Sequence, residues 1–458
     1  MMSAEQREEG PPLEDLAGRF RLICESAVNP LEIASALEFD GISNRAAHAG
    51  YDVPDVFALA RLLYARVPRK PAAPEAEPGP RAISRPVVHG LLYGLPAACF
   101  PAAGPLLVGP GVLAALIVAL LSGWGLSQGL AAVGFQRLGV SGPEQARPVL
   151  RTGLAGCLAL VTLVMVVTML TVHARLAVLA FGIGECAYML GACVLLVIGE
   201  ERWLPAALAP GVTGAALFLL LGKPGALADQ TWAALAVTPL IACVIAVVRT
   251  AGTRLRGGCL PSRRELLGAL PGASLGVVAA GLLSFPLAVG TSGHGGANVG
   301  AFIASVPLAL SMGAAEWNLL RYRRGSGQLL GQTDDPRWFR RRAGRLLLWT
   351  MLRHAAGTIV IAGAALAVAV LVAQVSPDQA VLLALGSYLL LGAAMFLVLL
   401  LQTVQVRLVP LALAAAALCA EITLRRYGLA VQVAAPAALL VTVGGYAYRR
   451  LGEAVLHA

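Results

Sequence analysis

The sequence predicts an all-α integral membrane protein with about twelve transmembrane helices in two six-helix halves, preceded by a small cytoplasmic helical domain. Apolar stretches follow one another from Val87 to Tyr448, each close to the roughly 20 residues that cross a hydrocarbon core of about 30 Å. Only 13% of the residues are charged, against about 25% in a soluble domain, because charges are costly in lipid. The basic residues gather in every second loop, as is typical of cytoplasmic loops.

The chain divides by composition into four segments. Residues 1–68 form the predicted cytoplasmic domain, and residues 69–86 are rich in Pro and Ala, which favours a semi-rigid linker. Residues 87–265 and 266–458 form the first and second membrane halves, the second with a cytoplasmic tail. The polar start of the chain has no apolar signal core, so we expect the N-terminus to stay in the cytoplasm.

The cytoplasmic domain is expected to be helical. Leu13, Leu16, Phe20 and Ile23 recur at helical spacing and give one apolar face. Asn29 followed by Pro30 predicts the capped start of a further helix. Asp52 and Asp55 are alternative caps for the last helix of the domain.

Two functions remain open for this domain. The spacing of apolar and polar residues in 43–63 is loosely similar to that of a helix-turn-helix motif, which would indicate DNA binding. The alternative is a small helical docking domain. Acidic side chains repel phosphate, and the domain holds several: Glu32, Glu38, Asp40, Asp52 and Asp55. We therefore expect residues 13–66 to dock a cytoplasmic protein and no nucleic acid.

Twelve spans are predicted, and the tight joins at 108–110 and 403–405 leave a re-entrant pair or one bent helix open. The spans are 87–108, 110–134, 149–173, 176–199, 204–222, 229–249, 266–290, 298–320, 345–373, 378–403, 405–424 and 427–449.

Charge sets the expected topology. With the N-terminus inside, the inner loops hold twenty arginines, eight of them in a long loop between Arg321 and Arg345. The outer loops hold only Arg175, Lys223, Arg425 and Arg426. Cytoplasmic loops carry the excess of basic residues, so we expect a plasma-membrane protein with both termini cytoplasmic. The pair at 425–426 runs against this rule, and either snorkels to the headgroups or marks misplaced last spans.

Prolines hint that the two halves are repeats, although chance matches are the alternative. Pro bends a helix, and matched bends are a feature of rocking transporters. The prolines that fall in corresponding spans of the two halves are Pro96, Pro101 and Pro105 with Pro271 and Pro286, Pro210 with Pro410, and Pro239 with Pro436.

Ionisable residues inside spans are candidates for a substrate or ion pathway. Glu185 lies near the middle of the fourth span, among small residues. It is a candidate proton, cation or substrate site, and the alternative is a neutral carboxyl bonded within the bundle.

A second group gathers at the cytoplasmic ends of the eighth and ninth spans. Glu316 and Asn318 lie late in the eighth span, and Arg353 and His354 lie early in the ninth. A Glu316–Arg353 pair would be either a gate or a structural ion pair.

Gln128, beside Ser127 in the second span, is a candidate lining residue of a polar cavity. The alternative is that its neighbours Gly123, Gly125 and Gly129 simply mark close helix packing. Gln402, Gln405, Glu421 and Gln432 lie near span ends and are weaker candidates.

The sequence holds no Walker A motif and no H-E-x-x-H. Its eight cysteines form no C-x-x-C or zinc spacing. We therefore expect no enzyme activity, no cofactor and no metal site.

Residues 311–330, SMGAAEWNLLRYRRGSGQLL, place a Glu late in a span before an aromatic, Arg-rich segment that continues through DDPRWFRRRAGRLLL. With twelve spans, this resembles the MOP superfamily of MATE and polysaccharide flippases, and is most similar to Pel-type exopolysaccharide transporters and related actinobacterial membrane proteins. The resemblance covers residues 87–450 and implies alternating-access export of a polysaccharide or lipid-linked glycan. Two features depart from the pattern of that family: the segment before the first span, and the absence of an acidic residue within that span. The alternative function is a membrane scaffold that recruits a partner, such as a glycosyltransferase, through the N-terminal domain.

Overall fold

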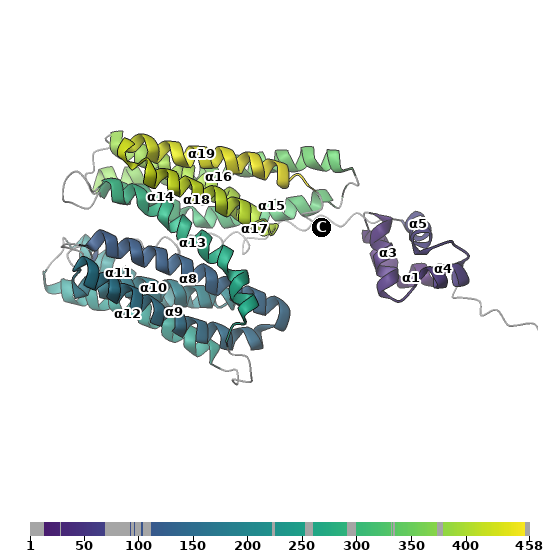
Figure 1. Ribbon diagram of the computed structural model, residues 1–458, viewed down its shortest axis with the longest axis horizontal. Helices are drawn as coiled ribbons and strands as arrows, with labels where there is room; N and C mark the ends of the chain where they lie inside the picture. Colours follow the sequence, from purple (N-terminus) through teal and green to yellow (C-terminus); the bar gives the residue numbers. More distant parts are fainter. Residues whose placement is uncertain are drawn as a thin grey trace, which may run out of the picture. The chain divides into compact units, whose positions relative to one another are not determined.

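The computed structural model describes residues 13–453, apart from residues 28, 69–91, 93–95, 97–101, 104–110, 222–224, 252–259, 291–298, 331, 333–334 and 373–378. The regular elements of this described chain are helices, without a strand (Figure 1). The fold class predicted from the sequence is confirmed. The predicted linker and nearly all of the predicted first span lie outside the described residues.

The helices fall into two groups along the chain. Five short ones precede the linker: α1 Leu13–Arg19, α2 Arg21–Ser26, α3 Pro30–Phe39, α4 Asn44–Tyr51 and α5 Val56–Arg66. Those after it are α8 Val112–Ser141, α9 Pro143–Val172, α10 Leu176–Val197, α11 Leu204–Leu220, α12 Gly225–Thr250, α13 Arg263–Gly290, α14 Val299–Leu310, α15 Met312–Leu330, α16 Pro336–Val372, α17 Gln379–Thr403, α18 Leu408–Thr423 and α19 Leu429–Arg450, with short 3-10 turns at Glu201–Trp203 and Arg425–Tyr427.

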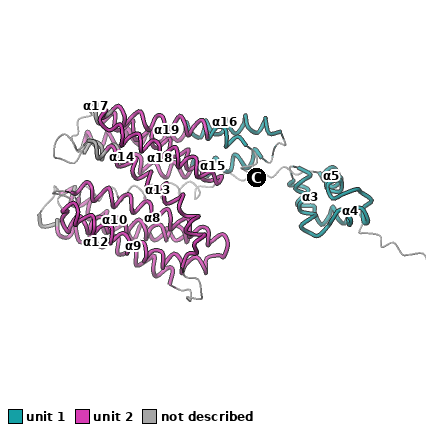
Figure 2. The backbone as a smooth tube through the Cα atoms, viewed as in Figure 1, with its two compact units in different colours: residues 1–83, 318–352, 447–458 teal, residues 84–317, 353–446 magenta. Residues whose placement is uncertain are grey.

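By its contacts the chain forms two compact units (Figure 2). One holds residues 1–83, 318–352 and 447–458, and the other holds residues 84–317 and 353–446. The second unit contains the greater part of the membrane helices.

Side chains cap the N-terminal helices where the sequence predicts caps. Asn29 Oδ1 accepts a 3.0 Å hydrogen bond from the Leu31 amide, and Pro30 occupies the first turn of α3. Asp55 Oδ1 accepts one of 2.7 Å from the Ala58 amide at the start of α5. Asp52 instead ends α4 with a positive φ of 53°, so of the two alternatives Asp55 is the cap.

These five helices enclose an apolar core of their own, which contains Leu16, Ile33, Leu37, Leu59 and Leu63. The single helical run expected from residue 13 is broken at Phe20 into α1 and α2. The break turns Ile23 outward, to 39% exposure. The expectation that Ile23 shares the buried face is therefore wrong.

Eight described helices are long and apolar enough to cross a membrane: α8, α9, α10, α12, α13, α16, α17 and α19. They correspond to eight of the twelve predicted spans. Of the other four, α11 has 17 residues and α18 has 16, close to the roughly 20 that a span needs. Arg407 precedes α18 and Gln405 has a positive φ of 60°, so α17 and α18 are separate helices and not one bent helix.

The region between residues 298 and 345 differs from the prediction. The eighth span is divided at Ser311 into α14 and α15, four residues after Pro307, a residue that cannot donate to the helical ladder. α15 then continues to Leu330, and α16 already begins at Pro336, where Asp335 Oδ1 accepts from the Arg337 amide at 2.9 Å. The long loop predicted at 321–345 is therefore wrong, and its arginines stand exposed on helices.

Within the second unit, α8, α9, α10, α11 and α12 pack against one another as one bundle. α13 packs along α8 and also contacts α14, α17 and α18 (Figure 1). α13 is thus the helix that links the first bundle to the helices of the second half.

Candidate functional site

α8 and α13 approach each other closely at glycines on both helices. Gly125 and Gly129 of α8 face Ala273 of α13, whose Cβ lies 3.3 Å from the position that a Cβ on Gly129 would take. In return, a Cβ on Gly276 would lie 2.6 Å from the carbonyl oxygen of Trp124. Small residues let membrane helices approach this closely. The close packing predicted for the glycines of the second span is confirmed.

Gln128 lies at the edge of this crossing. Its Cγ is 3.0 Å from where a Cβ on Gly276 would stand, and its side chain is exposed. The neighbouring Ser127 is buried and donates to the Trp124 carbonyl at 3.1 Å. An exposed amide in the middle of an apolar helix faces either lipid or water, and lipid would leave its hydrogen bonds unmade.

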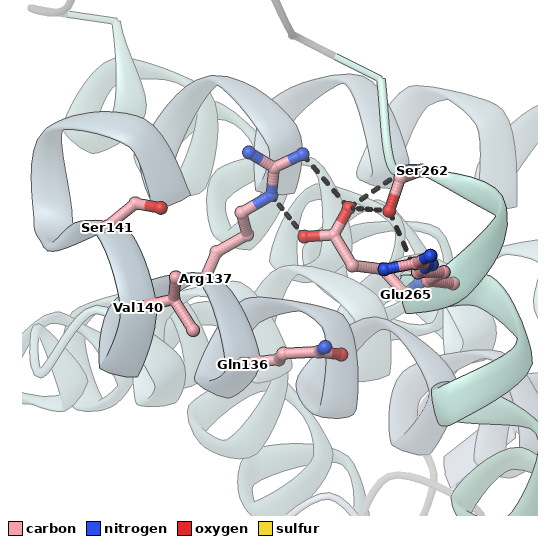
Figure 3. Close-up of a pocket in the computed structure, with 7 residues that line it drawn as sticks. Gln136, Arg137, Val140, Ser141, Ser262 and Glu265 are labelled. Atoms are coloured by element: carbon pink, nitrogen blue, oxygen red, sulfur yellow. Dashed lines mark hydrogen bonds and ion pairs between the residues drawn. The ribbon is translucent and has the colours of Figure 1, made fainter.

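An ion pair joins the same two helices near the end of α8 (Figure 3). Arg137 Nη2 donates to Glu265 Oε2 at 2.9 Å. The same carboxylate oxygen accepts from the Ser262 amide at 2.7 Å and from the Ser262 hydroxyl at 2.8 Å. Ser262 and Glu265 thus form a capping box at the start of α13, which holds the carboxylate toward α8.

A cavity of about 310 Å³ lies beside this pair. The residues that line it include Gln136, Ser141 and Arg264 together with the ion pair itself. Its volume is at the lower end of the roughly 300–1,000 Å³ of ligand pockets, and the ion pair between α8 and α13 forms part of its wall.

Glu185 lies on α10 and is half-buried. The next residue, Cys186, directs its thiol at the Ala119 carbonyl of α8, with a sulfur–oxygen distance of 3.1 Å. A Cβ on the preceding residue, Gly184, would lie 3.4 Å from Cγ of Pro239 in α12. Glu185 is therefore held between turns of α10 that pack on α8 and on α12.

The second predicted group lies on α15 and α16. A Cβ on Gly357 of α16 would be 4.0 Å from that of Ala314 in α15, so the two helices lie side by side there. Glu316 and Arg353 each lie within one turn of this contact and are half-buried. An ion pair between them stays a prediction.

The other two members of this group are more deeply buried. Asn318 is 2% exposed, as is His354. The His354 ring stacks on Phe396 of α17, with centroids 4.2 Å apart and planes inclined by 23°. This packing favours a structural role for His354.

A carboxyl that the sequence ranked as a weak candidate proves to be the most buried of those inside the spans. Glu421 of α18 is 1% exposed, and neither carboxyl oxygen has a hydrogen-bond partner among the described residues. Its place near a span end hid it. The sequence of α18 gave no further signal, because the side chains that precede Glu421 are apolar on every face of the helix.

In the part of the chain that the structure describes, no group of three or more His, Cys, Asp or Glu is arranged to hold a metal. The described cysteines, such as Cys186, are free thiols.

No model of a known family matches the sequence, and no curated protein matches it significantly. Solved structures do share its fold. An outward-facing multidrug resistance MATE family transporter of the MOP superfamily has a TM-score of 0.52 at 16% identity, over 81% of this chain and 95% of that one. A MATE in complex with Br-NRF and a MATE in the bent conformation each have a TM-score of 0.50, with the same identity and coverage.

These findings define the class of protein. The chain is a multi-pass α-helical membrane protein. More narrowly, it has the fold of the MATE transporters of the MOP superfamily.

Proposed function

We propose that the chain is a membrane transporter that works by alternating access, with no enzyme activity. The observation that carries this proposal is the exposed amide of Gln128 in the middle of α8, beside the crossing with α13. A polar side chain at this depth is expected to line a water-filled path. The shared fold supports the same conclusion, because its solved members are named transporters.

The proposed cargo is a polysaccharide or lipid-linked glycan moved outward. Gln128 and Glu185 offer an amide and a carboxyl, groups that donate to and accept from sugar hydroxyls. Neither α8 before Arg137 nor α10 carries a basic residue, so the proposed path suits a neutral, hydroxyl-rich cargo better than an anion. The protein would work in the plasma membrane with both termini in the cytoplasm.

Export in cells that lack their own copy of the protein tests this proposal. Gln128→Ala and Glu185→Gln should each lower export of the glycan at least tenfold while the protein remains folded in the membrane. Gln379→Ala, at an exposed amide on the first turn of α17, is the matched control and should export normally. Normal export by both site variants would remove the assignment.

A membrane scaffold is the second candidate function, favoured by the surface of the N-terminal helices. Phe39 is 97% exposed and Leu22 is 82% exposed, and such side chains are candidates for contact with a partner such as a glycosyltransferase. Deletion of residues 1–68 separates the two functions. Export that continues without partner recruitment supports a transporter with an accessory domain, whereas loss of both supports the scaffold.

A further inference from the structure

Glu421 is a buried carboxyl that the proposed cargo path does not use. It lies two residues before the end of α18 and is 1% exposed. Both of its oxygens are buried and lack a hydrogen-bond partner in the described chain. An ionised carboxylate left in this state costs several kcal/mol or more, and such a group instead takes up a proton.

No cation offsets the charge of Glu421 within the described residues. The arginine one turn further on, Arg425, is exposed, and no hydrogen bond from it reaches either carboxyl oxygen of Glu421. α13 has no titratable residue after Glu265, and the neighbouring part of α19 has none before Tyr446. The one titratable residue of α17 is Tyr388, a phenol that is uncharged near neutral pH.

The polar groups of the neighbouring helices are already engaged. The Tyr388 hydroxyl donates to the Leu283 carbonyl of α13 at 3.0 Å. The Ser387 hydroxyl donates to the Gln432 carbonyl of α19 at 2.6 Å. Both hydroxyl hydrogens are therefore used elsewhere, so neither stabilises a Glu421 carboxylate by donating to it. A proton needs only one carboxyl oxygen.

We propose that Glu421 is a proton-binding site of this protein. While α18 packs against α13, the Glu421 side chain is the neutral carboxylic acid, with an O–H bond formed by a proton taken up from water. When α18 separates from α13, water reaches the carboxyl, the O–H bond breaks and the proton passes to that water. Coupling of this cycle to cargo rests on the transport function proposed above, whereas the protonation itself does not.

Infrared difference spectroscopy of the full chain in lipid nanodiscs tests the protonation directly. At neutral pH the spectrum should contain the carbonyl band of a buried carboxylic acid, and Glu421→Gln should remove it. Glu144→Gln, at an exposed position on the first turn of α9, should leave it unchanged. Glu421→Asp, which keeps the acid, should shift the band without removing it.

The outcomes separate this site from the transport function. Loss of the band in Glu421→Gln supports the proton site even if the protein exports nothing. A Glu421 band already at the carboxylate position at neutral pH would overturn it, as would a spectrum that responds to sodium but not to pH. If the site stands and export occurs, Glu421→Gln should make export independent of an imposed pH gradient.

Discussion

Arg137 of α8 and Glu265 of α13 form an ion pair between these two helices, with Nη2 and Oε2 2.9 Å apart. The same helices interlock through Gly125, Gly129 and Gly276 further along. The crossing is therefore fixed by charge at one end and by close backbone contact in the middle. When the two halves move relative to each other, the ion pair has to break and the glycine contact has to slide.

The first prediction concerns the ion pair. Arg137→Ala leaves the Glu265 carboxylate, whose side chain is 10% exposed, without its cation. Hydrogen bonds to charged groups contribute about 1.5–3 kcal/mol, so we expect a loss of that order in the free energy of unfolding. Denaturation in detergent measures it, in a double-mutant cycle with Glu265→Gln. Arg264→Ala, exposed in the same cavity, should change stability by less than about 0.5 kcal/mol; an equal effect would contradict the pairing.

The second prediction concerns the glycine crossing. In Gly276→Ala the new Cβ would meet the backbone carbonyl of Trp124 at 2.6 Å, and backbone cannot yield as a side chain does. We expect a loss of about 1–3 kcal/mol, as for other overpacked contacts. Gly386→Ala in α17 has nothing within 4 Å and should be neutral or stabilising, because Gly is a poor helix former. Thermal melting compares the two, and equal stability would refute the close approach.

The third prediction is a pH dependence at Glu200. The hydrogen bond from Arg249 lowers the pKa of this carboxyl, with a further contribution from Arg202. A carboxyl with a lowered folded pKa stabilises the fold above its unfolded pKa of about 4.3, and the contribution disappears as the pH falls through the folded pKa. The gap in Tm between the natural protein and Glu200→Gln should thus be widest near neutral pH and close in acid. A gap that stays constant with pH would contradict this.

The fourth prediction concerns topology. Gln332 is exposed in the short connection between α15 and α16, among the arginines that the positive-inside rule places in the cytoplasm. In a background without other cysteines, Gln332→Cys should resist a membrane-impermeant thiol reagent in intact cells and react after lysis. Tyr427→Cys, exposed beside the exceptional Arg425, should react in intact cells. Reaction at residue 332 from outside would invert the topology.

Hydropathy predicted the fold class because every span must satisfy its own backbone in lipid. The helix boundaries were harder. The cluster of arginines near residue 340 led to the prediction of a loop, yet α16 runs through them from Pro336. The segment contains no internal proline that would end the helix. The break at Ser311 depends on Pro307, but other prolines, such as Pro239, lie inside unbroken helices.

The candidate site was predictable only in part. Gln128 and its glycine neighbours stood out by residue type, and the structure places them at the α8–α13 crossing. Glu421 did not, because α18 is apolar on all sides apart from it and its sequence does not show which face is buried. The residue type of His354 made it an equally strong candidate, but its ring stacks on Phe396, which favours a structural role. Residue type predicts the presence of a polar group in a span, whereas its exposure depends on packing between distant helices.

The accessibility of residue 128 tests the central claim most directly. In proteoliposomes of the full chain without other cysteines, Gln128→Cys should react with a membrane-impermeant maleimide, because the claimed path carries water to it. Leu163→Cys on α9, 62% exposed and expected to face lipid, should not react. If residue 128 proves as unreactive as residue 163, it faces lipid, and the water-filled path between the halves does not exist.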